Sequence, residues 1–348
     1  MPKKRESPYL DGLIDKYIKR AKGFYPGLEF GSRFSLYSGD EPRHCKLEFS
    51  LKSKNLINTE YHVKRKYDVI HYTSSLQNVI EILNSGLFRL SNLIALNDPQ
   101  ELRFIINNLK MDFNKKQIEK YKSHFFCGSF CRVLNKKKPD EFPMWRLYGD
   151  DGFGAAIIFE IVNYEKDWSN FLISKVQYGD AKSVSRYNEF MDFHNLFQKE
   201  NNQPLQSGDL PYALTALMAL HKNKIWEYEK EIRILTYNEY DHLYTLKSNE
   251  PHICEVKHSV LKNGKKYSFV ELPLLGSKEF RRISKIINEA SSNYLNNRFP
   301  IIKVKEVILG YRIEDTVVSN VEDIVAYVSN SFGYQINIRK SHLSEHMH

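Results

Sequence analysis

The stretch Trp226-Glu227-Tyr228-Glu229-Lys230-Glu231-Ile232-Arg233 gathers acidic, aromatic and basic residues where an apolar run begins. In an extended chain, successive side chains point to opposite faces. Glu229, Glu231 and Arg233 would then share one strand face, with Ile232 on the other. Two carboxylates on one strand face can hold a ribose and position a nucleophile, but a solvated strand shows the same pattern. The apolar residues also fit helical spacing, in which the two glutamates would not share a face.

The composition is that of an ordinary globular chain. Its 348 residues are 42% hydrophobic and 27% charged, and this length suits two domains or one decorated domain. The sequence has no run of about 18 apolar residues and no basic-then-apolar leader, which predicts no membrane span, no signal peptide and a cytoplasmic location. The cysteines are expected to be reduced thiols because they lack zinc-site spacing: Cys45, Cys127, Cys131 and Cys254.

The net charge of +9 is unevenly distributed along the sequence. Residues 1–70 contain 15 Lys or Arg and 9 Asp or Glu, and Lys136-Lys137-Lys138 forms a second basic cluster. Basic patches attract phosphate groups, so a nucleic acid or a nucleotide is a candidate partner. Short lysine runs are also typical of solvated loops, and this alternative stays open.

Apolar spacing divides the chain into an extension and a core. We predict a basic N-terminal extension over 1–60, irregular with short strands after its first helix. The core is expected over 61–312, with a helical insertion at 181–224. A C-terminal helix and strand at 313–348 are expected to pack on it. Strands and helices alternate irregularly in the core, which favours an α+β fold with a mixed or antiparallel sheet.

Turn and capping residues locate the other elements. Thr73-Ser74-Ser75 and Gly86 are expected to begin and end one helix, and Asn97-Asp98-Pro99-Gln100-Glu101 has the capping box that begins another. Further helices are expected at 9–22, 144–148, 277–296 and 314–328. Strands are expected at 67–72, 124–130, 154–159, 229–236, 252–256, 266–272, 304–309 and 334–339.

The common catalytic signatures are absent from the sequence: it contains no Walker loop, GxGxxG, GxSxG or HExxH. Four other motifs, taken together, resemble a widespread bacterial family of proteins of unknown function. The match spans residues 67–310, and Ile232 stands where the family more often has an aromatic residue. The motifs are His71-Tyr72-Thr73-Ser74, Leu96-Asn97-Asp98-Pro99 with Glu101, Met144-Trp145 with Tyr148, and Trp226 to Arg233.

The order of His, Ser and Glu along the chain also resembles the ADP-ribosyltransferase fold. In such enzymes a His or Arg on the first strand contacts the cofactor ribose, and a Ser on a second strand orders the site. A Glu, often within ExE, contacts the nicotinamide ribose. The resemblance gives these roles to His71, Ser129 and Glu231, with Glu229 as the auxiliary acid. The full Ser-Thr-Ser pattern of the family is absent around Ser129.

This resemblance implies NAD as the substrate. Cleavage of the ribosyl–nicotinamide bond passes through an oxocarbenium-like centre, which a carboxylate such as Glu231 can stabilise. Glu229 would orient or deprotonate the acceptor. The other cofactor contacts that the resemblance implies are His71 and Thr73 at a strand end, Tyr72 or Tyr148 against the nicotinamide, and Arg233 or Arg146 at the pyrophosphate.

The function expected from these resemblances is that of an ADP-ribosyltransferase or NAD glycohydrolase, acting as a bacterial toxin or anti-phage effector. Its acceptor would be a nucleic acid or a protein. A second hypothesis is a non-catalytic module that binds a nucleotide or nucleic acid. A third, a metal-dependent nuclease using Glu229, Glu231 and Asp98, has no matching ligand spacing, so we expect no metal site.

Each candidate residue also has a structural interpretation. His71 is equally compatible with a core histidine bonded to backbone, and the strand carboxylates with cross-strand ion pairs. Asp98 and Glu101 are better explained as helix caps. The catalytic hypothesis therefore requires His71, Ser129 and Glu231 to line one cleft.

Overall fold

The computed structural model describes residues 8–24, 28–38, 41–51, 56, 59–63, 68–96, 102, 106–107, 115–162, 168, 171–179, 182–202, 204–206, 216–237, 256–261, 264–290 and 299–345. They form an α+β structure with mixed, mostly antiparallel sheets, as predicted. The chain divides into two compact units. Unit 1 comprises 1–62, 96–123 and 174–227, and unit 2 comprises 63–95, 124–173 and 228–348.

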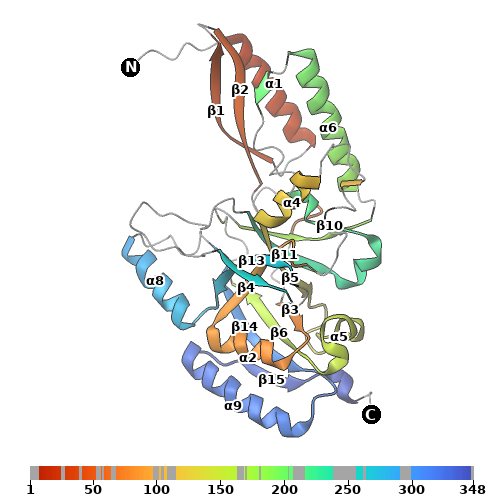
Figure 1. The fold of residues 1–348 in the computed structure, drawn as a ribbon, viewed down its shortest axis with the longest axis vertical. Coiled ribbons are helices and arrows are strands. Elements are labelled where there is room, and N and C mark those ends of the chain that lie inside the picture. The colour runs from red at the N-terminus through yellow and green to blue at the C-terminus, as the bar shows by residue number, and fades with distance from the viewer. Residues whose placement is uncertain are drawn as a thin grey trace. The chain divides into compact units, whose positions relative to one another are not determined.

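Unit 1 contains a helix pair and a long hairpin (Figure 1). Strand β2 pairs antiparallel with β1 and parallel with β9, and β8 pairs parallel with β10. Its elements are α1 (Pro8–Phe24), β1 (Leu28–Ser38), β2 (Glu41–Leu51), most of α4 (Lys115–His124), β8 (Gln177–Tyr178), α6 (Lys182–Glu200), β9 (Leu205–Gln206), β10 (His221–Lys222) and the start of the 3-10 helix η3 (Lys224–Glu229).

A buried tyrosine joins the two long helices of unit 1. The Tyr17 hydroxyl of α1 lies 2.8 Å from Nδ1 of His194 on α6. The Tyr17 ring also stacks on Phe193, with 5.3 Å between ring centroids. This contact gives the amphipathic spacing of residues 9–22 an apolar partner in α6.

Two predictions for unit 1 are corrected by the structure. The region expected to contain only short strands after the first helix holds two strands of 11 residues each, paired as a hairpin. The insertion expected to be helical over 181–224 is helical only at Lys182–Glu200, and β9 and β10 follow. These two-residue strands exist because β2 and β8 pair with them, and no local pattern reports such a partner.

Unit 2 is built around a ten-stranded sheet. The strand order is β12-β13-β4-β5-β3-β6-β14-β15, with β11 paired to β5 and β7 paired to β11. Its elements are β3 (Asp68–Thr73), α2 (Leu76–Ser85), β4 (Leu87–Asn92), β5 (Phe125–Arg132), α5 (Phe142–Tyr148), η2 (Asp150–Gly152), β6 (Ala155–Ile161), most of β7 (Phe171–Lys175), β11 (Glu231–Tyr237), β12 (Lys257–Val260), β13 (Lys266–Pro273), α8 (Lys278–Ala290), β14 (Ile302–Leu309), α9 (Asp315–Phe332), β15 (Asn337–Lys340) and η5 (His342–Glu345).

Helices cover both faces of this sheet because its strands present apolar side chains on both sides. On the α9 face, Phe130 and Phe159 pack in one cluster with Val79 of α2 and Val325 of α9. On the opposite, α5 face, Tyr72 and Ile158 pack with Trp145 and other residues of α5. Figure 1 shows α2 and α9 below the strands and α5 beside them.

The capping signals around α2 are confirmed. Ser75 is the N-cap and its side chain accepts a hydrogen bond from the Gln77 backbone N–H. Gly86 ends the helix at φ 65°, a left-handed conformation that glycine adopts without a steric cost.

Some expected features lie outside the described residues. These are the helix start at Asn97–Glu101, most of the strand at 252–256, Cys254 and the Lys64-Arg65-Lys66 cluster. In the described parts of the chain, no helix combines the length and the apolar character needed to cross a bilayer.

Candidate functional site

The motif from Trp226 to Arg233 is only partly a strand. Residues Lys224–Glu229 form the 3-10 helix η3, and β11 begins at Glu231. Lys230 joins them with a φ of 47°, in the left-handed region that non-glycine residues seldom occupy. The expectation that Glu229 shares a strand face with Glu231 and Arg233 is therefore corrected.

Glu231 and Arg233 form a buried ion pair on β11. Arg233 donates from Nε to Glu231 Oε1 at 2.8 Å and from Nη2 to Oε2 at 3.3 Å. The two side chains are only 3% and 1% exposed, so this is not the solvated strand face of the structural alternative. Ile232 and Ile234 point into the apolar cluster on the α9 face, as the alternation predicts.

Strand β5 places Ser129 on the same face as this ion pair. In the antiparallel β5–β11 ladder, Ser129 stands opposite Arg233, and Cys131 stands opposite Glu231. Directly opposite residues of a ladder project to the same side of the sheet. Cys131 also packs on the cluster of the α5 face, so this face holds Ser129, Glu231 and Arg233 together.

Glu229 is held by a tyrosine from α5. The Tyr148 hydroxyl donates a short hydrogen bond to Glu229 Oε1, and the glutamate is buried. Burial raises the pKa of the Tyr148 hydroxyl, and the charges of Glu229 and Glu231 raise it further. The phenol therefore stays protonated and remains a donor, and both carboxylates lie near it.

Tyr72 fills the space between β3 and α5. Its ring packs edge-on against Trp145, with 5.1 Å between centroids, and its hydroxyl oxygen accepts the Glu141 backbone N–H at 3.0 Å. Burial raises the pKa of this phenol, partly offset by the hydrogen bond from Glu141.

A cavity of about 10 Å³ lies beside these residues, which is room for about one water molecule. Its lining comes from both ends of the DUF-like motif set and from β3 and β5: Ile70, Tyr72, Cys131, Arg132, Pro139, Glu141, Met144, Tyr228, Glu229 and Lys230.

His71 lies on the other side of the sheet. Its ring contacts Phe88 and Phe130 of the α9 face, with centroids 5.1 Å and 6.0 Å away. Its Nδ1 is 3.1 Å from the Ser129 carbonyl oxygen, which can only accept, so Nδ1 carries the proton. Burial lowers the pKa of His71, and the bond to Ser129 partly opposes that shift. The structure thus joins Ser129 and Glu231 but not His71.

The sheet leaves a space that this ring occupies. Strand β11 pairs with β5 along its whole length, whereas β4 pairs with β5 only near Cys127 and β3 only near Cys131. Between these two short pairings, the other edge of β5 has no strand partner, and His71 bonds to its backbone there.

Part of this site matches a known protein family. Residues 144–234 match the family described as Protein of unknown function (DUF2971). This agrees with the predicted likeness to a family of unknown-function proteins. A search of curated proteins found no match. A search of solved structures found none either.

The DUF2971 segment contains both ends of the site. It begins at Met144 in α5 and ends at Ile234 in β11, so Tyr148, Glu229, Glu231 and Arg233 all fall within it. Ser129, Tyr72 and His71 precede the matched residues.

Two further residues with proposed cofactor roles lie elsewhere. The Thr73 hydroxyl is buried within 2.8 Å of the Ser75 carbonyl and 3.0 Å of the Ala155 carbonyl, so it ties the end of β3 to β6. Arg146, on the solvent side of α5, lies 3.8 Å from Asp151 and is 65% exposed. Neither side chain contacts Glu231 in the described structure.

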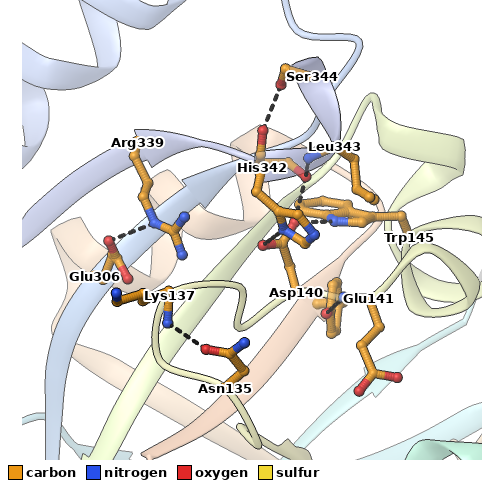
Figure 2. A network of polar contacts seen from close by, with 12 residues as sticks. Asn135, Lys137, Asp140, Glu141, Trp145, Glu306, Arg339, His342, Leu343 and Ser344 are labelled. Carbon is orange, nitrogen blue, oxygen red and sulfur yellow. Dashed lines mark hydrogen bonds and ion pairs between the residues drawn. The ribbon is translucent and has the colours of Figure 1, made fainter. Parts of the chain in front are cut away.

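A buried carboxylate that the sequence analysis missed lies at the other end of α5. Asp140 accepts hydrogen bonds from Trp145 Nε1 and from His342 Nδ1, each at 2.9 Å, and a short one from the Ser341 hydroxyl. Figure 2 shows the Trp145 and His342 rings directed at Asp140. These contacts fasten η5 to α5. No spacing signal exists for them, because Asp140 and His342 are 202 residues apart.

The electrostatics of Asp140 follow from these contacts. Burial acts to raise the pKa of its carboxyl, but the hydrogen bonds from Ser341, Trp145 and His342, with the His342 charge, outweigh it. The net effect lowers the pKa below its ordinary value of 3.8.

The described residues were also searched for metal ligands. They contain no group of three or more His, Cys, Asp or Glu side chains placed to hold a metal ion. Asp98, which the nuclease hypothesis needs, lies outside them. Cys45, Cys127 and Cys131 are not in disulfides.

Proposed function

We propose that unit 2 cleaves the bond between nicotinamide and ribose in NAD, as a transferase or glycohydrolase. The observation that carries this proposal is the common face of Ser129, Glu231 and Arg233 on two paired strands. Glu229 and Tyr148 lie next to them. These are the residue types, in the chain order, that the resemblance to ADP-ribosyltransferases calls for.

Glu231 is the residue we propose as the central carboxylate. Two hydrogen bonds from Arg233 hold it in one orientation. A carboxylate fixed in this way needs no reorganisation to stabilise positive charge that develops on a ribose. Arg233 is then a positioning residue for Glu231 rather than a pyrophosphate ligand.

Glu229 is the candidate general base in this proposal. The protonated Tyr148 hydroxyl orients it, and its position before β11 puts it at the rim of the small cavity. A base at that place can take the proton of a water or of another acceptor. We leave His71, Thr73 and Arg146 out of the proposed site because their contacts are elsewhere.

The proposal requires the site to open. A cavity of about 10 Å³ cannot admit a dinucleotide, so residues around it must move before NAD binds. The backbone at Lys230, with a φ of 47°, is the strained point next to both glutamates. Strain of this kind often marks segments that change conformation. We assign the movement to residues 228–230.

NAD loss is the action expected of a toxin or an anti-phage effector, and this is the biological role that the proposal implies. The link is one of association between fold and role, so it is tested only through the activity itself.

A second candidate function is favoured by one specific observation. Both oxygens of Glu231 accept bonds from Arg233, and the pair is almost fully buried. A carboxylate occupied in this way suits a non-catalytic module that keeps the fold and binds a nucleotide.

The test is nicotinamide release from NAD by the purified full chain, measured by liquid chromatography. Wild type is compared with Glu231→Gln and Glu229→Gln. The matched control is Glu271→Gln on β13, a glutamate that pairs with Arg89 and Lys257 and lies outside the site. Circular dichroism confirms that each variant is folded.

Release that is lost in a folded Glu231→Gln or Glu229→Gln protein, and kept in Glu271→Gln, supports the proposal. Equal release by wild type and both site variants overturns it. The proposal also fails if wild type releases no nicotinamide. In that case NAD binding by calorimetry identifies the non-catalytic module.

A further inference from the structure

The helix α8 carries a basic stripe on its exposed side. Lys278, Arg281, Arg282 and Lys285 are spaced i, i+3, i+4 and i+7, which places them on one side of a helix. All four are exposed. Figure 1 shows α8 (light blue) at the margin of unit 2.

The other side of α8 is committed to the core of the unit. Phe280 and Ile283 are buried, and Ile283 belongs to the apolar cluster of the α9 face. The helix therefore has an apolar side that the protein itself covers and a basic side that faces solvent.

Most of this charge is not neutralised within the described structure. Arg281 donates from Nη1 to the Ser331 carbonyl at 2.9 Å and to the Gly276 carbonyl, which anchors it without cancelling its charge. Arg282 pairs with Glu279, at 2.9 Å from Nε to Oε2. In the described part of the chain, no acidic side chain forms an ion pair with Lys278, Arg281 or Lys285.

Lysines of the neighbouring hairpin extend the positive surface. Arg282 lowers the pKa of Glu279 by a hydrogen bond that outweighs burial, and the charges of Lys257 on β12 and Lys278 add to this effect. Lys257 therefore lies near α8. Residues 257–285 hold eight Lys or Arg and two Glu, a net +6, although the whole chain of 348 residues carries only +9.

We propose that the α8 stripe (Lys278, Arg281, Arg282 and Lys285), with Lys257 beside it, binds the phosphate backbone of a nucleic acid. The stripe covers about 10 Å of helix axis at about 1.5 Å per residue. Duplex DNA presents about one negative charge per 1.7 Å, so about six phosphates face such a length.

A membrane surface fits α8 less well than a nucleic acid. Helices that lie on a bilayer insert an exposed apolar side between the lipids. In α8 that side is packed against the sheet through Phe280 and Ile283. The surface is also distinct from the proposed NAD site, and this inference does not rest on NAD cleavage.

The test is fluorescence anisotropy of the full chain with a labelled 20-base-pair DNA duplex and its RNA counterpart, between about 50 and 200 mM salt. Wild type is compared with Lys278→Gln/Lys285→Gln. The control, Lys136→Gln/Lys137→Gln, removes the same charge from two exposed lysines of another basic cluster in unit 2.

We expect the α8 variant to bind several-fold more weakly, with a salt slope smaller by about 2, because each lost phosphate contact removes about 0.9. The control should match wild type. Equal weakening by the control overturns the assignment to α8, and so does the absence of binding by wild type. Binding to vesicles of phosphatidylserine and phosphatidylcholine, lost in the α8 variant while duplexes fail to bind, replaces the nucleic acid with a lipid surface.

Discussion

Arg233 and Glu231 lie two residues apart on β11 and form a buried ion pair, with Nε and Oε1 separated by 2.8 Å. Both charges are removed from water, so each depends on the other. The pair stands opposite Ser129 and Cys131 of β5 and joins the two strands of the candidate site.

Replacement of Arg233 by Gln leaves the Glu231 charge buried without its main partner. We expect the free energy of unfolding to fall by about 3–5 kcal/mol. The double variant Glu231→Gln/Arg233→Met should lose less than the sum of the single variants, because neither charge remains. Urea denaturation followed by circular dichroism measures these values.

A surface pair provides the comparison. Lys340 lies 2.8 Å from Asp315, whose side chain is 89% exposed. Lys340→Gln should cost no more than about 1 kcal/mol. Equal effects of Arg233→Gln and Lys340→Gln would show that burial does not strengthen the β11 pair.

Asp140 predicts a dependence of stability on acid pH. Because its folded pKa is below 3.8, its contribution is complete above that pH and is lost as the pH falls through the folded pKa. Asp140→Asn should lower the free energy of unfolding at pH 7 by about 2–4 kcal/mol, since it weakens three hydrogen bonds to a charged acceptor. The gap between wild type and variant should narrow below about pH 4. A gap that stays constant from pH 6 to pH 3.5 in urea titrations contradicts this account.

His194 predicts a second pH dependence, in unit 1. Burial lowers its pKa from 6.5 to about 4. Between these values the unfolded chain binds a proton that the folded chain excludes, so stability falls as the pH is lowered. We expect a loss of about 2–3 kcal/mol between pH 6.5 and pH 4 that His194→Gln removes. Denaturation curves at pH 7, 5.5 and 4.5 measure it, and an unchanged pH dependence in the variant refutes it.

Gly154 is expected to tolerate no side chain. A Cβ at this position would lie 2.1 Å from the Thr73 carbonyl oxygen and 2.9 Å from that of Gly149, both backbone atoms. Gly154→Ala should therefore lower the thermal midpoint strongly, by more than about 2 kcal/mol of stability. Gly12→Ala is the matched control, because nothing lies within 4 Å of its Cβ in the middle of α1. It should stabilise the protein by about 0.5–1 kcal/mol. Midpoints that move in the same direction would contradict the packing argument.

Local chemistry was sufficient to predict several elements. Ser75 and Gly86 bracket α2 because a side-chain acceptor and a left-handed glycine act within one turn of the helix. The alternation in β11 correctly placed Ile232 and Ile234 on the core side. For the candidate site, the same alternation correctly paired Glu231 with Arg233 but assigned Glu229 to the strand.

Other features depended on partners far away in the chain. Strand β9 exists only through its pairing with β2, and Asp140 finds His342 across 202 residues. His71 also illustrates this limit, since its order in the sequence suggested a common cleft with Glu231. Its neighbours Val69 and Thr73 share its side of β3, and the packing of that side against Phe88 and Phe130 decided its place.

The sequence alone therefore determined the α+β class, the capped helix α2 and the inward and outward sides of β11, because these depend on residues within a few positions of one another. The tertiary structure alone decided that Ser129 stands opposite Arg233, that the glutamates are buried, and that His71 lies on the other face. Those outcomes depend on strand register and on which helix covers each face, and both are set by contacts between distant segments.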